Sequence, residues 1–383
     1  MRILYLSADP GVPVLGHKGA SVHVRELAQA MEQCGAMVAI ASPRVGDEGA
    51  HFRSEVTLAS IPPVLPKQLT DAGLRYAMEE QSVAVERIAR GLHADVIYER
   101  FSLFSVAGVR AASRLSIPHV LEVNAPLRAE AARFRTLPHP EMAALAEREV
   151  LAGTDAIYAV SAALAEWLQS MGCTAPIEVM PNAIDPSQFS GRAQGLGDRF
   201  VVGFAGSLKP WHGIDVMLEA CQSAMSEQPS LRLEIVGDGP MRSAIDRAVL
   251  PKYRVTVFGH VDHAEAIRMM QGWHAGLAPY HDVPGFYFSP LKVVEYMAAG
   301  VCPVASDLGQ IRDLLGGGSR GVLVRPGDAA SLARALVDLA TEPAVVEQLA
   351  SAAREYVLST HTWQGNATRV IDVVHALCAR RAA

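Results

Sequence analysis

Short apolar runs without polar alternation recur along the whole chain, and helical stretches separate them. Ten of these runs are predicted to be buried strands: Ile3–Ser7, Val38–Ser42, Val96–Tyr98, His119–Val123, Ala156–Val160, Phe200–Phe204, Arg232–Val236, Val255–Phe258, Ala275–Ala278 and Cys302–Ala305. Helical stretches such as Ser21–Cys34, Asp71–Gly91 and Asp215–Ser226 lie between them. Buried strands that alternate with helices are typical of parallel sheets covered on both faces. The pattern therefore predicts an α/β fold.

The chain is long enough for two domains, and its composition indicates a boundary between them. Its 383 residues exceed one ordinary hydrophobic core. Pro181–Phe189 is rich in turn residues, and the polar, Gly-rich segment Ser190–Arg199 follows it before a new strand, turn and helix begin. We therefore expect two doubly wound Rossmann-like domains, residues 1–190 and 191–363. Ligands of such sheets bind beyond the carboxyl ends of the strands.

Composition and charge exclude several classes of function. The net charge of −6 argues against nucleic acid as a main partner. No apolar run reaches the roughly 18 to 20 residues that span a bilayer, so the sequence predicts no transmembrane segment and leaves peripheral membrane contact open. The five cysteines are scattered without a CxxC pair, which is typical of a reduced, cytoplasmic protein without a disulfide framework.

The segment 285–300 predicts an anion site at the start of a helix. Ser289 is a good helix N-cap, and Pro290 suits the first helical position. The free amides of Leu291 and Lys292 then point out of the helix start, where the positive end of the helix dipole favours a phosphate. Glu295 lies farther along the same helix, within reach of whatever is attached to that phosphate. A capped surface helix without a ligand is the alternative for this segment alone.

Two glycine-containing loops connect predicted strands to predicted helices. The loop within Leu6–Ser21 contains Gly16 and Gly19, and glycines let a ligand approach the backbone. Its spacing is not GxGxxG, which disfavours NAD as the ligand. In the second half, the loop within 202–215 contains Lys209, whose charge suits a diphosphate. An ordinary flexible loop and a solvated lysine are the respective alternatives.

Together these motifs resemble those of the nucleotide-sugar-dependent glycosyltransferases of the GT-B fold, specifically the large retaining family four. The resemblance covers nearly the whole chain and rests on the segments Gly19–Ala28, Val179–Asp185, Gly206–Gly213, Ile235–Pro240, Phe258–Val261 and 285–300. It implies two Rossmann-like domains facing each other across a cleft, with a helix in 364–383 that crosses back to the first domain. It also implies that a sugar passes from a nucleotide-diphosphate sugar to a hydroxyl acceptor. In this family the anomeric configuration is retained, the departing phosphate assists, and neither a metal nor another cofactor is needed.

The resemblance assigns candidate roles to individual residues. Glu295 is expected to hold the ribose hydroxyls of the donor. The backbone from Phe288 to Lys292 is expected to bind the diphosphate and the donor sugar. Lys209 lies in the loop that supplies basic residues to the phosphates, and it is also a catalytic candidate. The other donor-binding candidates are Gly16, Gly19, Ser207, His212, Gly259, Val261, Tyr287, Ser289 and Leu291.

The chain departs from the family pattern at three places. Tyr287 stands where the first of two acidic residues is expected, eight positions before Glu295. The usual basic pair falls near Ser207 and His212, so Lys209 and His212 are expected to serve in shifted form. Asn124 stands where many members have a histidine near the reacting carbon, and an amide cannot act as a base.

Two catalytic candidates lie at the end of one predicted strand, and two further classes of function remain as alternatives to a transferase. Glu122 leaves the same strand end as Asn124, and both are catalytic candidates; Glu122 either orients the acceptor or makes a structural hydrogen bond. A GT-B enzyme other than a transferase, such as a sugar-nucleotide epimerase, is the second class. A nucleotide-sugar-binding protein with a degenerate site is the third, and Tyr287 and Asn124 are its best support.

Overall fold

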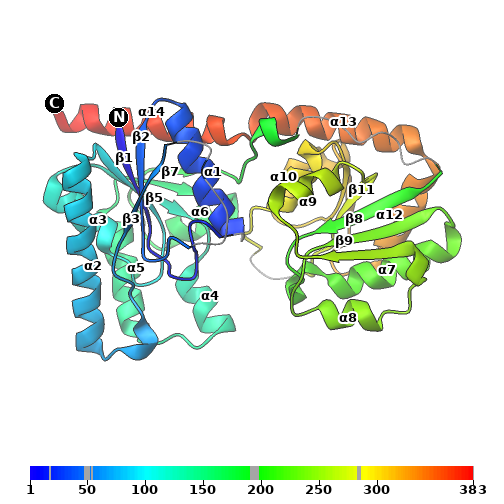
Figure 1. Cartoon of the computed structure of the whole chain (residues 1–383), viewed down its shortest axis with the longest axis horizontal. Helices are drawn as coiled ribbons and strands as arrows, with labels where there is room; N and C mark the ends of the chain where they lie inside the picture. Colours follow the sequence, from blue (N-terminus) through cyan, green and yellow to red (C-terminus); the bar gives the residue numbers. More distant parts are fainter. Residues whose placement is uncertain (17–18, 47–51, 53–54, 190–197, 283–285, 383) are drawn as a thin grey trace. The chain divides into compact units, whose positions relative to one another are not determined.

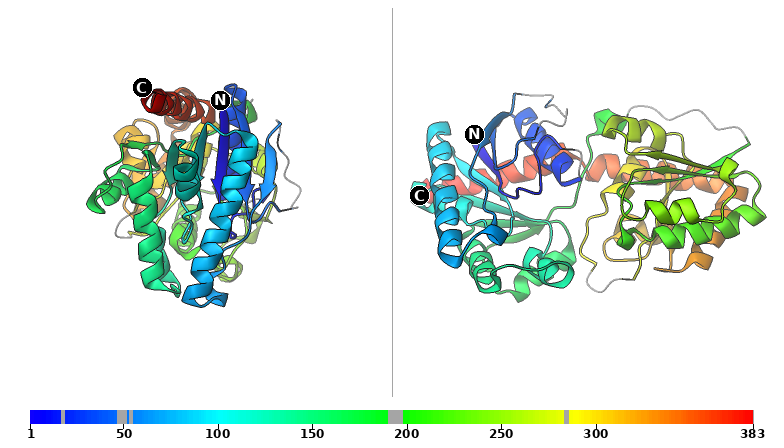
Figure 2. Two further views of the ribbon diagram at one scale, coloured as in Figure 1. Left: turned by 90° about the vertical axis from the view of Figure 1, so that its left-hand side faces the viewer. Right: turned by 60° about the horizontal axis from the view of Figure 1, so that its bottom comes forward.

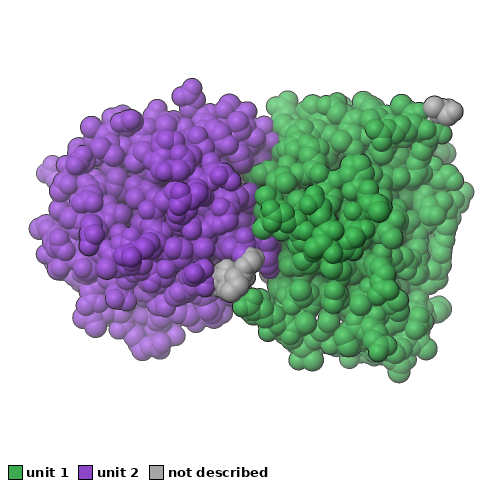
Figure 3. Space-filling model, turned by 180° about the vertical axis from the view of Figure 1, so that it is seen from behind, with its two compact units in different colours: residues 1–182, 363–383 green, residues 183–362 purple. Residues whose placement is uncertain are grey.

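The computed structural model describes residues 1–16, 19–46, 52, 55–189, 198–282 and 286–382. The chain divides into two compact units (Figure 3). Unit 1 comprises residues 1–182 and 363–383, and unit 2 comprises residues 183–362. The boundary between the units thus lies before residue 190, where it was expected, and residues 190–197 of the predicted linker lie outside the described residues.

Unit 1 contains a seven-stranded sheet in the order β3-β2-β1-β4-β5-β6-β7 (Figure 1). All of its strand pairs are parallel. The central strands are buried along almost their whole length, as expected for strands covered on both faces. The strands are β1 (Arg2–Ser7), β2 (Met37–Ser42), β3 (Thr57–Ser60), β4 (Val96–Arg100), β5 (His119–Val123), β6 (Ala156–Ala159) and β7 (Ile177–Val179).

Seven helices are described in unit 1, and one of them comes from the end of the chain. They are α1 (Gly19–Gln33), α2 (Asp71–Leu92), α3 (Ala107–Leu115), α4 (Leu127–Phe134), α5 (Pro140–Gly153), α6 (Ala162–Ser170) and α14 (Trp363–Ala382). Helix α14 lies beside α1 (Figures 1 and 2). Its first residue, Trp363, packs edge-on against His23 of α1, with ring centroids 4.7 Å apart. Asn366 donates a hydrogen bond to the Pro181 carbonyl at 3.0 Å.

Unit 2 contains a six-stranded parallel sheet in the order β10-β9-β8-β11-β12-β13. Its strands are β8 (Phe200–Ala205), β9 (Leu231–Val236), β10 (Val255–Gly259), β11 (Ala275–Ala278), β12 (Cys302–Ser306) and β13 (Val322–Val324). Helices α7 and α12 bury apolar residues on one face, α9 and α10 do so on the other, and α13 contributes to both clusters. The helices are α7 (Ile214–Glu227), α8 (Arg242–Arg247), α9 (His263–Met270), α10 (Leu291–Ala298), α11 (Ile311–Leu314), α12 (Ala329–Thr341) and α13 (Pro343–Thr360).

The predicted α/β class and all ten predicted strands are confirmed. Three further strands, β3, β7 and β13, were not expected; each is the outermost strand at one edge of its sheet. Among the helices of the described residues, none combines the length and the apolar character needed to cross a lipid bilayer.

Candidate functional site

The strand order of unit 2 reverses between β8 and β11, which marks the place where open α/β sheets bind ligands. The loop 206–213 leaves the carboxyl end of β8 here and leads into α7. Two backbone hydrogen bonds hold its start. Gly206 donates to the Val236 carbonyl at 2.9 Å, and Leu208 donates to the Asp238 carbonyl at 3.0 Å. The segment after β9 therefore shapes the loop after β8.

Helix α10 begins differently from the prediction. Pro290, rather than Ser289, occupies the N-cap position, and no side chain caps the helix. The amide of Leu291 donates to the Ser289 carbonyl at 2.9 Å, so this donor is already used. The amide of Lys292 has no acceptor in the part of the chain that the structure describes. The predictions of a Ser289 cap and of a free Leu291 amide are therefore wrong, while a donor remains at Lys292.

The side chain of Lys292 lies against the ends of the two strands that flank the switch point. Its Nζ is 4.0 Å from the centre of the Phe204 ring, near the end of β8. It is 5.6 Å from the centre of the Tyr280 ring, just beyond β11. Although the residue as a whole is half-buried, Nζ is buried and makes no hydrogen bond to the described residues. Burial lowers the pKa of the Lys292 ammonium to about 7, and Glu295 opposes this shift only in part.

The loop 206–213 contains three predicted site residues, Ser207, Lys209 and His212, whose contacts differ. His212 folds back so that its Nδ1 lies 2.5 Å from the Ser207 carbonyl oxygen. Burial, and then the nearby Lys292, lower the pKa of His212 to about 3, so its ring is neutral near pH 7. Lys209 lies with its Nζ 5.9 Å from the centre of the Trp211 ring. The expectation that His212 serves as a basic residue is therefore not met.

Glu295 is held by a histidine that the sequence did not indicate. His263, the first residue of α9, donates from Nε2 to Glu295 Oε1 at 2.8 Å. The side chain of Glu295 is 12% exposed, so the carboxylate remains accessible. Because α9 follows β10 closely, this contact joins Glu295 to the segment that contains the predicted residues Gly259 and Val261.

An aromatic pair, Tyr287 and Phe288, begins at the position where the family pattern has its first acidic residue. The rings of Tyr287 and Phe288 are 4.4 Å apart, and Phe288 also contacts Phe286, with ring centroids 5.4 Å apart. The Phe288 carbonyl accepts a hydrogen bond from the Gln310 side chain at 3.0 Å. The backbone before α10 is thus anchored from outside the segment.

In unit 1, a buried polar network surrounds Glu122 at the end of β5. Its Oε2 accepts hydrogen bonds from His23 Nε2 at 2.9 Å and from the Tyr98 hydroxyl at 2.7 Å. Its Oε1 accepts one from Arg100 at 2.7 Å and another from the Asn124 side-chain amide. Burial alone would raise the pKa of Glu122, but His23 and Arg100 lower it well below its usual range.

This network favours the structural one of the two roles considered for Glu122. The side chain is 1% exposed and both of its oxygens are engaged, so it does not face a ligand. Its hydrogen bonds are structural, and one of them fixes the half-buried side chain of Asn124. The alternative in which Glu122 itself orients the acceptor is therefore not supported.

The predicted glycines of unit 1 lie at the start of α1. Gly16 ends a turn that Arg25 of α1 holds, because Arg25 donates to the carbonyls of Val14 at 2.7 Å and Gly16 at 2.6 Å. Gly19 is the first residue of α1, and residues 17–18 lie outside the described residues. Arg25 thus fixes the approach to α1, a role that no sequence motif indicated.

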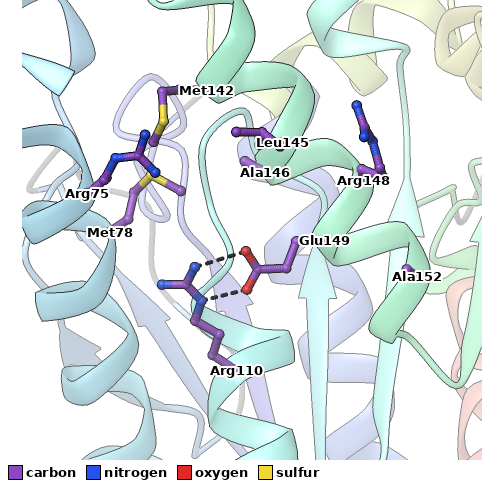
Figure 4. Close-up of a pocket in the computed structure, with 9 residues that line it drawn as sticks. All are labelled: Arg75, Met78, Arg110, Met142, Leu145, Ala146, Arg148, Glu149 and Ala152. Atoms are coloured by element: carbon purple, nitrogen blue, oxygen red, sulfur yellow. Dashed lines mark hydrogen bonds and ion pairs between the residues drawn. The ribbon is translucent and has the colours of Figure 1, made fainter. Parts of the chain in front are cut away.

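A separate cavity of about 540 Å³ lies between α2, α3 and α5 of unit 1 (Figure 4). Arg110 forms a two-pronged ion pair with Glu149 at 2.6 and 2.9 Å, and it reaches Glu79 at 3.1 Å. Met78 and Met142 contribute apolar lining. The Arg110 charge is therefore paired, and the lining includes no residue that the sequence analysis singled out.

Comparisons of sequence support one family. The family described as Glycosyltransferase Family 4 matches residues 17–188, and the one described as Glycosyl transferases group 1 matches residues 199–342. A glycogen synthase of Mycobacterium tuberculosis is 25% identical over 398 aligned positions, which cover 97% of this chain and 94% of that protein.

Comparisons of structure support the same fold. Sucrose-phosphate synthase from Thermosynechococcus elongatus superposes with a TM-score of 0.76 at 19% identity, covering 99% of both chains. HepE of Anabaena in complex with UDP-glucose superposes with a TM-score of 0.73 at 19% identity, covering 98% of this chain and all of that one. With two parallel α/β units, a matched family in each and these neighbours, the chain belongs to the family-four glycosyltransferases of the GT-B fold and is a nucleotide-sugar-dependent glycosyltransferase.

Proposed function

We propose that this protein is a retaining, metal-independent glycosyltransferase that moves a hexose from a nucleotide-diphosphate sugar to a hydroxyl acceptor. The observation that carries the proposal is the carboxyl edge of the unit 2 sheet. There the start of α10, with the unused Lys292 amide, lies one helical turn from the accessible carboxylate of Glu295. A phosphate at the helix start and a ribose at the carboxylate fit this spacing.

In the proposed reaction, acceptor attack and donor departure take place on one face of the donor sugar. The acceptor oxygen bonds to the anomeric carbon on the face from which the nucleoside diphosphate departs. As the bond between that carbon and the phosphate oxygen breaks, the acceptor proton passes to the departing phosphate. Charge builds up on the diphosphate, so donors fixed at the start of α10 stabilise the transition state more than the ground state. Retention of the anomeric configuration is the result.

Residues of unit 1 have a supporting role in this proposal. The Asn124 amide, oriented by Glu122, hydrogen-bonds a hydroxyl of a sugar and does not take up a proton. Gly16 and Gly19 are proposed to approach the donor from unit 1. Glu122 is a positioning residue, because its contacts reach the ligand only through Asn124.

Turnover by the full chain tests the proposal. UDP-glucose, GDP-mannose and ADP-glucose are incubated with sugar and inositol phosphate acceptors in the presence of EDTA, and nucleoside diphosphate release is followed. We expect acceptor-dependent release that EDTA leaves unchanged, and proton NMR of the product should show the anomeric configuration of the donor. Conversion of the donor sugar without an acceptor would instead indicate an epimerase. Donor binding without any turnover would indicate a degenerate binding protein.

We expect Glu295→Ala to raise the KM for the donor about 10- to 100-fold with little change in kcat. A hydrogen bond to a charged group contributes about 1.5–3 kcal/mol, and ribose is remote from the reacting bond, so the loss is equal in the ground and transition states. Glu265→Ala is the matched control, because Glu265 pairs with Arg268 on the solvent side of α9. An unchanged donor KM in Glu295→Ala would remove Glu295 from the site.

A further inference from the structure

The loop 206–213 offers the donor's diphosphate one lysine in place of the basic pair of the family pattern. Ser207 and His212 stand where the family pattern has a basic pair, and the His212 ring is neutral near pH 7. Lys209 lies beside Trp211 in the same loop. A leaving diphosphate in a site without a metal needs a positive charge nearby.

Lys292 combines a positive charge with a buried position at the switch point of the sheet. We propose that the Lys292 ammonium is the cation that binds and neutralises the donor diphosphate, an inference that rests on the function proposed above. Its Nζ lies at the switch point of the sheet, against the Phe204 and Tyr280 rings near the ends of β8 and β11. An ammonium that is buried without a hydrogen-bond partner has three unused donors.

Gly206 opens a path from a ligand to this ammonium. A Cβ placed on Gly206 would lie 3.3 Å from Lys292 Nζ, and Gly206 is only half-buried. Because glycine has no Cβ, no side chain of residue 206 stands between the ammonium and a phosphate that contacts the Gly206 backbone. The unused amide of Lys292 is at the start of α10, so one residue offers both a backbone donor and a charge to the same anion.

Within the described part of the chain, the charged and titratable groups around Lys292 leave its ammonium without a close anionic partner. His212 faces it from the loop 206–213, and its pKa is lowered to about 3. Tyr280 faces it from beyond β11, and burial of the Tyr280 phenol raises its pKa, so the ring is neutral. Glu295 is on the same helix, and its negative charge partly opposes the lowering of the Lys292 pKa. Its carboxylate accepts a hydrogen bond from His263. A bound diphosphate would therefore be the nearest anion to the Lys292 ammonium.

Proton uptake on donor binding is the consequence. With a pKa of about 7, the Lys292 ammonium is largely deprotonated at pH 8 when the site is empty. An anion within a few ångströms favours the charged form, so binding raises this pKa. We expect the proton uptake per donor to be substantial at pH 8 and small at pH 6. Above pH 7 the donor affinity should fall by up to about tenfold per pH unit.

Calorimetry in two buffers of different ionisation enthalpy measures this uptake. The probes are UDP-glucose, GDP-mannose and ADP-glucose, because a diphosphate that is esterified at both ends has no ionisation of its own near neutral pH. The full chain is used with whichever probe it binds. Binding without proton uptake at pH 8 would overturn the assignment of Lys292 and leave the proposed function standing. Failure of all three probes to bind would overturn both.

Three variants distinguish the contribution of Lys292 to donor binding and proton uptake from those of two other lysines. Lys292→Met should weaken binding about 10- to 100-fold and abolish the uptake, since a charge-assisted hydrogen bond is lost. Lys252→Met, which removes an exposed lysine of unit 2, should change neither. Lys209→Met should keep the uptake. Uptake that persists in Lys292→Met, or disappears in Lys209→Met, would contradict the proposal. The wild-type pH series decides the question even if a variant fails to fold.

Discussion

Glu122→Gln is expected to lower the free energy of unfolding of unit 1 by about 3–5 kcal/mol, because it leaves the half-buried Arg100 without its counter-charge and removes an acceptor from a buried hydrogen-bond network. His23 and Arg100 both donate to this carboxylate, and Tyr98 adds a third hydrogen bond. A neutral amide keeps the shape of the side chain but presents only one acceptor oxygen. Urea unfolding at pH 7, followed through the transition that includes unit 1, measures the change.

The pH dependence of the same unfolding transition is a second, independent test of the contribution of Glu122 to stability. The pKa of Glu122 is lower in the folded state than in the unfolded chain, where it is about 4.3. Its contribution to stability is therefore complete above about pH 5 and is lost as the pH falls through the folded value. Wild type should lose stability on acidification below pH 5 more steeply than Glu122→Gln.

Glu178→Gln is the matched control for this prediction. Glu178 pairs with Arg369 of α14, but its side chain is 46% exposed. Exposed ion pairs contribute about 0–1 kcal/mol, so this variant should remain close to wild type. Equal effects of the two substitutions would show that the network around Glu122 does not hold unit 1 together.

Most of the fold could be predicted because central strands carry a strong signal. β1, β5 and β8 are buried along almost every residue, and a run of buried apolar residues is what the sequence displays. The missed strands β3 and β7 lie at the sheet edges, are only four and three residues long, and are largely exposed or half-buried. An edge strand needs no continuous apolar run, so its sequence resembles a loop.

The start of α10 shows where local rules fail. A serine before a proline predicts an N-cap, yet Pro290 takes that position and the Ser289 carbonyl accepts from Leu291. The Phe288 carbonyl is tied to the Gln310 side chain, which is distant in sequence. Tertiary anchoring of the preceding backbone, rather than cap propensity, accompanies this shift of the helix start.

The sequence predicted the secondary structure around the candidate site but not the side-chain contacts within it. Sequence motifs located the strand ends and the helix start, since these features are local. They could not show that Lys292 meets Phe204 and Tyr280, or that His263 holds Glu295, because the chain brings these residues together from different strands and helices. The lowered pKa of Lys292 follows from that packing.

Gly213→Ala is expected to cost unit 2 about 4 kcal/mol or more, whereas Gly300→Ala should cost about 1–2 kcal/mol. Both glycines have left-handed backbone angles, with φ of 61° and 73°, so an added Cβ strains both to a similar degree. They differ in the space around that atom. At Gly213 it would lie 1.5 Å from the Pro279 carbonyl oxygen, whereas at Gly300 its nearest neighbour is Arg354 Cδ at 3.7 Å.

The clash at Gly213 would affect the site as well as the stability. Pro279 directly follows β11, so relief of the clash must separate the loop 206–213 from the strand end where Tyr280 contacts Lys292. We therefore expect the folded fraction of Gly213→Ala to bind UDP-glucose, GDP-mannose or ADP-glucose weakly, whereas Gly300→Ala binds as wild type does. Unfolding curves give the stability difference between the two variants, and calorimetry gives the difference in binding. Two variants with equal stability would mean that backbone strain alone accounts for both costs, and that the loop does not need its close approach to Pro279.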